Sequence, residues 1–365
     1  MEYDMIVVGA GLAGSSAAKA AAEKGTRVIL IEEHPAIGIP QHCTGRLRGT
    51  LRSNLSKTIL ESISTPVVVT RYKARRFYAP SGKMVAEIPM GDTGCCLILR
   101  DVFDRELARQ AANAGADIVL NTRVTGLLKE GERVTGVTTN SMSLPQVHGK
   151  VVVAADGLYS TEKGIPRWEG LCPPVKVTRA GIQFELARVR DIEPDVMEYH
   201  GGSFCKMGFV MLWPQSSSSC FLSFIDKIEE FERLKAGNYL ISRKLKDAVP
   251  VRMIGYTQVL DPKGPWPRIV KDGLMLVGEA AGWFGIIQAI LSGRFAGEVA
   301  ADAIKKGDVS EASLSRYNEI YQKLNTALPT KQGSPSLNPS DETIENSMME
   351  QARSGQWKFL DMLDI

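Results

Sequence analysis

The sequence lacks the features that would assign it to several specialised classes of protein. Its net charge is only +3 in 365 residues and it has no basic run, so composition gives no support to nucleic-acid binding. The six cysteines show no CxxC spacing, which argues against a zinc site and against a disulfide framework. Unpaired cysteines of this kind predict a reducing, cytoplasmic setting.

Long apolar runs are also missing. The longest, residues 274–291, contains Glu279 and three glycines, and it predicts a buried strand, a turn and a helix rather than a membrane span. The chain begins directly in an apolar strand, which is unlike a signal peptide. We therefore expect a cytoplasmic protein, and peripheral contact with a membrane surface remains compatible with these features.

The first 32 residues do contain a complete dinucleotide-binding unit. An apolar strand runs into the turn Gly9-Ala10-Gly11-Leu12-Ala13-Gly14, an alanine-rich helix follows, and a second apolar strand ends at Glu32. Glycines in such a turn let the backbone approach a pyrophosphate at the positive end of the helix dipole. Glu32 stands where an acid can bind a ribose hydroxyl. The alternative is a glycine turn in an ordinary α/β sheet.

Hydrophobic periodicity divides the rest of the chain into two kinds of segment. Residues 1–174 and 263–328 contain buried strands and amphipathic helices, with a β-rich insertion at about 60–98, whereas residues 175–262 contain alternating runs between polar turns. We predict an α/β fold, with a Rossmann-like dinucleotide-binding domain and an inserted antiparallel-sheet substrate domain. Residues 329–365 are predicted to form a linker and a C-terminal helix that carries Trp357 and Phe359.

Three further motifs resemble the flavoprotein superfamily that includes p-hydroxybenzoate hydroxylase. They are Leu99-Arg100-Asp101 before a helix, Ala154-Ala155-Asp156-Gly157 at a strand end, and Gly278-Glu279-Ala280-Ala281-Gly282 before another helix. In that superfamily the third motif contacts the ribityl chain and pyrophosphate of FAD, usually through an aspartate. The resemblance implies FAD as the cofactor, with the longer Glu279 at the position of the aspartate.

Two segments are similar to the geranylgeranyl reductases within that superfamily. The segment Pro40-Gln41-His42-Cys43-Thr44-Gly45 is similar to their PxxCxG segment, and residues 208–214 are similar to an aromatic strand of their substrate-facing sheet. The resemblance covers about residues 1–305. It implies an FAD-dependent oxidoreductase that reduces double bonds in isoprenoid chains of lipids or prenyl diphosphates, with NAD(P)H or ferredoxin as electron donor.

The same resemblance implies a set of cofactor contacts. The glycine turn and Glu32 would hold the adenosine half, residues after Pro40 would lie along the cofactor, and two others would close over its ribityl and adenine sides. The implied cofactor-binding residues are Gly9, Gly11, Ala13, Gly14, Glu32, Cys43, Thr44, Arg46, Arg100, Val124, Glu279, Gly285 and Ile286.

Cys43 is the predicted catalytic residue. Reduction of an isolated alkene needs a dry slot, a hydride from the flavin and a proton source, and a thiol beside the flavin can supply the proton or orient the substrate. The alternative is that Cys43 is a small, inert neighbour of the ring. Either an isoprenoid tunnel or an ordinary core is likewise predicted for the aromatic and methionine residues Phe204, Met207, Phe209, Met211 and Trp213.

Two other functions stay open at this point. Flavin-dependent monooxygenases and halogenases use the same superfamily fold. Residues 283–288 form a shorter connection than the family has, and together with Glu279 this shortening is compatible with a degenerate, non-catalytic flavoprotein homologue.

Overall fold

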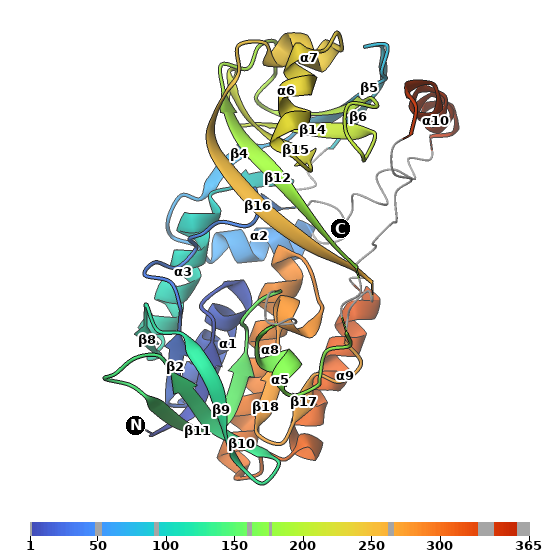
Figure 1. The fold of residues 1–365 in the computed structure, drawn as a ribbon. Helices are drawn as coiled ribbons and strands as arrows, with labels where there is room; N and C mark the ends of the chain where they lie inside the picture. Colours follow the sequence, from blue (N-terminus) through green and yellow to red (C-terminus); the bar gives the residue numbers. More distant parts are fainter. Residues whose placement is uncertain are drawn as a thin grey trace.

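The computed structural model describes residues 2–47, 53–90, 95–158, 163–174, 177–261, 266–327 and 339–355. Figure 1 shows a lower part built on a parallel sheet and an upper part built on a second sheet. Two long paired strands, β12 (Val177–Ala187) and β16 (Val249–Asp261), run from one part to the other.

In the described residues the lower part has an eight-stranded sheet, in which strand β1 (Glu2–Val8) lies centrally between β11 (Gln146–Ala154) and β2 (Val28–Ile31). Both neighbours are parallel to β1, and residues 5–8 and 151–154 are buried on both sides. Continuous apolar runs suit this position because helices cover both faces of a parallel sheet. The other strands are β8 (Asp117–Val119), β9 (Val124–Glu130), β10 (Arg133–Thr139), β17 (Val270–Lys271) and β18 (Leu274–Leu276).

Helices α1 (Leu12–Ala22) and α8 (Ile286–Lys306) pack side by side against this sheet (Figure 1). A Cβ atom on Gly293 would lie 1.9 Å from the Ala13 carbonyl oxygen, and one on Gly297 would lie 2.3 Å from that of Ala17. Both contacts move forward by four residues, from Ala13 to Ala17 in α1 and from Gly293 to Gly297 in α8, so the two helices run in the same direction. Ile286 lies seven residues before Gly293, so α8 begins about 10 Å beyond the contact with Ala13.

Other helices complete the lower part. Helix α3 (Arg100–Asn113) contacts α1, and α9 (Glu311–Ala327) contacts α8. A small sheet of β3 (Arg46–Leu47), β7 (Cys96–Ile98) and β4 (Val68–Arg71) lies between the two parts, with α2 (Ser53–Glu61) nearby. Helix α5 (Ile165–Trp168) follows β11.

The upper sheet is seven-stranded over the ranges described, in the order β16-β12-β15-β14-β13-β5-β6. The sequence predicts an antiparallel sheet from residues 175–262, but β5 and β6 come from the segment assigned to the insertion at 60–98, and β5 is parallel to β13. Stacking of Phe77 on Tyr199, with ring centres 4.6 Å apart, joins the two segments. The strands not yet bounded are β5 (Ala74–Tyr78), β6 (Met84–Pro89), β13 (Val196–Gly201), β14 (Phe209–Pro214) and β15 (Ser219–Ile225).

The two faces of this sheet have different surroundings. One face, which we call the outward face, packs Leu186, Leu212 and Leu222 against helices α6 (Ile228–Ala236) and α7 (Leu240–Leu245). The other, the inward face, presents Trp213 and Phe221 toward the small sheet, where the Tyr72 hydroxyl donates a hydrogen bond of 2.9 Å to the Pro214 carbonyl. The inward face is therefore turned toward the dinucleotide-binding part.

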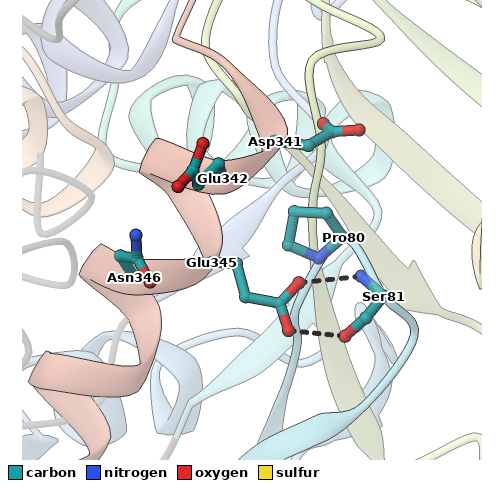
Figure 2. A pocket seen from close by; sticks show the side chains of 6 residues that line it. All are labelled: Pro80, Ser81, Asp341, Glu342, Glu345 and Asn346. Atoms are coloured by element: carbon teal, nitrogen blue, oxygen red, sulfur yellow. Dashed lines mark hydrogen bonds between the residues drawn. The ribbon is translucent and has the colours of Figure 1, made fainter.

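Helix α10 (Asp341–Ser354) covers the far end of the inward face with Ile344 and Met348. Figure 2 shows the Glu345 carboxylate accepting hydrogen bonds from the Ser81 amide (3.1 Å) and hydroxyl (2.7 Å), beside a pocket of about 430 Å³. The helix begins after Ser340 because the Ser340 hydroxyl accepts from the Thr343 amide. The predicted helix around Trp357 lies outside the described residues. Among the residues that are described, no helix is long and apolar enough to cross a bilayer.

Candidate functional site

The glycine turn after β1 forms a cradle at the start of α1. A Cβ atom on Gly9 would lie 2.5 Å from the Ala155 carbonyl oxygen, and one on Gly14 would lie 1.9 Å from the Gly9 carbonyl oxygen. At Gly11, by contrast, no atom of the described residues other than its neighbours along the chain lies within 4 Å of the Cβ position. Open space in front of an uncapped helix N-terminus is what a phosphate group requires. The turn therefore fits the pyrophosphate of a dinucleotide.

Glu32 occupies the position of the predicted ribose ligand. One carboxylate oxygen accepts a hydrogen bond of 2.8 Å from the Ala10 amide, and the other contacts the amide (3.0 Å) and Nδ1 (2.7 Å) of His34. A carboxylate can accept about four hydrogen bonds, so capacity for a ribose hydroxyl remains. The Thr122 amide donates to the Glu32 carbonyl at 2.9 Å, which brings the half-buried Val124 at the start of β9 near this end of the site.

The 3₁₀ helix η1 (Gly278–Ala281) lies against the first turn of α1. A Cβ atom on Gly278 would be 3.0 Å from that of Ala13, and the Gly278 amide donates to the Ser292 hydroxyl at 3.0 Å. Glu279 therefore sits beside the phosphate cradle. Its side chain is accessible to solvent but closely surrounded by protein atoms, and this desolvation raises its pKa, while the positive charge of Arg100 opposes the rise.

Arg100 joins the third motif to the segment of residues 40–45, which we call the Cys43 loop. Its guanidinium makes two hydrogen bonds to Asp104, of 2.9 and 2.8 Å. Burial by itself lowers the pKa of Arg100, but the charge and hydrogen bonds of Asp104 outweigh it, with smaller contributions from Cys43 and Glu279. The fold thus brings Cys43 and Glu279, from two distant segments, within electrostatic range of Arg100.

The Cys43 loop lies between the two parts of the molecule. Cys43 is half-buried, its Sγ accepts from the Gly45 amide at 3.4 Å, and Thr44 is buried. Arg46 follows, and its guanidinium lies 4.7 Å from the centre of the Trp213 ring on the inward face. Arg46 therefore contacts the upper sheet as well as lying next to the predicted cofactor residues.

Three residues that the sequence did not single out connect this loop to the upper sheet. Gln41 donates through Nε2 to the Cys43 carbonyl at 2.6 Å and accepts through Oε1 from Arg252 at 2.6 Å. Arg252 in turn donates to Glu185 at 2.7 Å. The position of Gln41 inside the PxxCxG-like segment is the signal that could have pointed to it.

Gly285 and Ile286 lie where α8 begins. Ile286 is the first residue of the helix and Gly285 precedes it, exposed to solvent. Because α8 begins seven residues before its contact with Ala13, its N-terminus lies about 10 Å beyond the first turn of α1. Residues 283–288 thus lead directly into a well-formed helix.

The predicted tunnel residues divide between the two faces of the upper sheet. Phe209, Met211 and Trp213 belong to the inward face, whereas Phe204 packs in the outward cluster. The inward side of the sheet also carries buried polar atoms that have no hydrogen-bond partner among the described residues. They are Nε of Arg75, Oε1 of Gln183, Nε1 of Trp213 and Oγ of Ser223.

Known proteins are similar to this chain. Residues 4–159 match a family model described as FAD dependent oxidoreductase. A digeranylgeranylglycerophospholipid reductase from Methanosarcina acetivorans is 33% identical, over 88% of this chain and 80% of the relative. One from Methanocella arvoryzae is also 33% identical, over 90% of this chain and 85% of the relative.

Solved structures agree on the fold. A geranylgeranyl bacteriochlorophyll reductase-like protein from Thermoplasma acidophilum matches with a TM-score of 0.78 and 24% identity, over 98% of this chain and 97% of its own. A flavin-dependent brominase matches with a TM-score of 0.68 and 17% identity, over 100% of this chain and 90% of its own. The predicted α/β flavoprotein fold with FAD as cofactor is confirmed. The chain belongs to the digeranylgeranylglycerophospholipid reductase family and is an FAD-dependent oxidoreductase.

Proposed function

We propose that this protein reduces the isolated carbon–carbon double bonds of geranylgeranyl chains carried by a glycerophospholipid. The observation that carries the proposal is the hydrogen-bonded link from the Cys43 loop through Gln41 and Arg252 to a sheet whose inward face is largely apolar. The relatives named above are digeranylgeranylglycerophospholipid reductases, which supports this substrate class. Prenyl diphosphates share the isoprenoid chain and are the second substrate to test.

The residues of the lower part fit FAD. The turn of Gly9, Gly11 and Gly14 leaves room for the pyrophosphate, Glu32 retains capacity for a ribose hydroxyl, and Glu279 lies beside the same cradle. When bound and reduced, FAD supplies a hydride to one carbon of the double bond. The amides of Gly285 and Ile286 are proposed to contact the flavin, and Arg100 and Val124 to close over the ribityl and adenine sides.

Cys43 is proposed to supply the proton that the second carbon of the double bond needs. Its Sγ is half-buried and receives the Gly45 amide, which holds the thiol in one orientation. Gln41 fixes the carbonyl of the same residue, so the loop cannot shift without breaking a hydrogen bond. A fixed approach and a defined proton donor are the two contributions that a protein can make to reduction of an unpolarised alkene.

The inward face is proposed to hold the isoprenoid chain and to exclude water from it. Phe209, Met211 and Trp213 contribute an apolar surface, and α10 covers its far end with Ile344 and Met348. We further propose that NAD(P)H or ferredoxin delivers the electrons. A lipid substrate implies that the protein works in peripheral contact with a membrane in the cytoplasm.

The decisive experiment uses the FAD-loaded protein under anaerobic conditions. The flavin is reduced with dithionite, an unsaturated digeranylgeranylglycerophospholipid in detergent is added, and the absorption spectrum and lipid mass are followed. Return of the oxidised flavin bands together with a mass gain of two hydrogens per double bond supports the proposal. Flavin that reoxidises only in air, with an oxygenated product, would instead indicate a monooxygenase. Flavin that does not respond to any isoprenoid would indicate a non-catalytic homologue.

A further inference from the structure

A continuous row of side chains crosses the inward face from one edge of the upper sheet to the other. Arg75 on β5 pairs with Met197, the register of β13 with β14 continues the row to Trp213, and Trp213 pairs with Phe221. Phe221 pairs with Glu185, and Glu185 pairs with Arg252. The row therefore ends at the residue that binds the Cys43 loop through Gln41.

Arg75 is the unusual member of this row. It is 8% exposed, and its buried Nε has no hydrogen-bond partner among the residues that the structure describes. No acidic oxygen of the described residues lies within 4.0 Å of its guanidinium. Its neighbour Arg76 points to the opposite side of the same strand, is more exposed, and pairs with both Glu87 and Glu193. The contrast shows that strand β5 neutralises one of its two arginines and leaves the other uncompensated.

A largely buried guanidinium that no acidic residue neutralises, and whose terminal nitrogens are not among the buried unpaired atoms, is available to an anion from outside the protein. Pairing with an opposite charge stabilises a charged group in a largely buried position, and arginine does not lose its proton in proteins. The planar fork of a guanidinium matches the oxygens of a phosphate group. The neighbours of Arg75 on this face, Met197, Phe77 and Ile88, are apolar and can accompany a hydrocarbon chain but cannot neutralise a charge.

We propose that Arg75 binds the phosphate of the isoprenoid substrate and so anchors its head group at the β5 side of the inward face. The proposal rests on the proposed reduction of isoprenoid chains. Five strand spacings separate β5 from β16 in the sheet, about 24 Å in all. A chain anchored at Arg75 would run along the row of side chains and bring its double bonds toward the Cys43 loop.

The test compares substrates that differ only in charge. The FAD-loaded wild type and Arg75→Gln variant are assayed with digeranylgeranylglyceryl phosphate, with geranylgeranyl diphosphate and with neutral geranylgeraniol. We expect the substitution to raise the KM of phosphate-bearing substrates about 10- to 100-fold, as loss of a charged hydrogen-bonded pair does, and to leave geranylgeraniol unchanged. Arg76→Gln is the matched control, and it should not alter this preference.

The outcomes separate the anchor from the reductase function. An increase in KM for only one of the two phosphate substrates identifies which head group Arg75 binds. An equal increase in KM for all three substrates, or an increase for none of them, overturns the proposal while leaving the reductase function intact. If the wild type reduces none of the three compounds, the anchor is tested by the change in melting temperature that each compound causes. The proposal is supported if the phosphate-bearing lipids stabilise the wild type, geranylgeraniol does not, and Arg75→Gln abolishes the stabilisation. The proposal is overturned if the phosphate-bearing lipids stabilise the Arg75→Gln variant as well.

Discussion

The side chain of Gln41 accepts a hydrogen bond of 2.6 Å from Arg252, and this contact joins the Cys43 loop to the edge strand β16 of the upper sheet. The same side chain donates to the Cys43 carbonyl. Movement of the sheet and movement of the predicted proton donor are therefore coupled through one amide group.

Replacing Gln41 by Leu should lower kcat/KM for the lipid by about tenfold, because it removes two hydrogen bonds that position the loop. Arg252→Met should act on the same interaction. In a double-mutant cycle the two substitutions should show a coupling free energy of about 0.5–3 kcal/mol, measured from kcat/KM. Fully additive effects would show that Gln41 and Arg252 do not act as a pair.

Glu279 should be required for tight binding of FAD. Glu279→Leu removes the carboxylate beside the phosphate cradle and should weaken FAD binding about 10- to 100-fold, whereas Glu279→Asp keeps the acceptor and should retain most of the affinity. Fluorescence titration of the apoprotein with FAD measures both. Glu298→Gln, at a half-buried position nineteen residues further along the chain in α8, is the control. An unchanged dissociation constant for Glu279→Leu would remove Glu279 from the cofactor site.

Gly293→Ala should be strongly destabilising. The added methyl group would lie 1.9 Å from the Ala13 carbonyl oxygen, so α1 and α8 would have to separate. Overpacking of this kind costs about 1–3 kcal/mol or more, and the cost should appear in urea unfolding curves together with weaker FAD binding. Arg294→Ala, at the next and exposed position, should change stability by less than about 0.5 kcal/mol. Equal stability of the two variants would contradict the tight contact between these helices.

Acid should destabilise the protein through a buried cluster behind the outward face. Glu198 accepts hydrogen bonds from His200 at 2.8 Å and from Lys244 at 3.0 Å, and all three side chains are buried. Burial lowers the pKa of His200 more than Glu198 raises it. Burial tends to raise the pKa of Glu198, but its hydrogen bond to His200 and the charges of His200 and Lys244 outweigh this and lower it.

The sign of the pH effect follows from these directions. As the pH falls below about 6.5, the unfolded chain protonates His200 before the folded protein does, so the free energy of unfolding decreases. Below about 4.3 the depressed pKa of Glu198 removes further stability in the same way. The pKa of His42 is also lowered, mainly by desolvation, and adds to the first effect. Urea unfolding measured between pH 5 and pH 8 gives the free energy of unfolding at each pH. This free energy should change less steeply with pH in His200→Gln than in the control His148→Gln. If His200→Gln leaves this pH dependence unchanged, the buried cluster does not contribute to the loss of stability in acid.

The site residues that could be predicted from the sequence are those whose role depends on local geometry. The turn at Gly9–Gly14 and the acid Glu32 follow from one strand–turn–helix unit, and the structure supplies the cradle that this unit predicts. Arg75 was missed, although alternation in β5 places it on the same face as Phe77. A buried charge without a partner becomes visible only when the neighbouring strands are known.

The arrangement of the upper sheet could not be predicted for a similar reason. Strands β5 and β13 are separated by more than 100 residues, and their parallel pairing depends on contacts such as Phe77 with Tyr199. Local alternation predicts that each segment is a strand but does not specify its partner. Helix α10 lies within residues 329–365, where the sequence predicts a linker and a C-terminal helix, but only Ile344 and Met348 of it are buried, so its apolar pattern does not specify its bounds.

The paired strands β12 and β16 restrict how the two parts of the molecule can move. Their ladder continues over eleven residues of β12, from Val177 to Ala187, which corresponds to about 37 Å of hydrogen-bonded ribbon. A ribbon of this kind resists sharp bending but can change its twist. Separation of the upper sheet from the Cys43 loop would therefore occur by torsion along the ribbon. Admission of a long lipid chain would then be a slow, collective motion rather than the opening of a local flap.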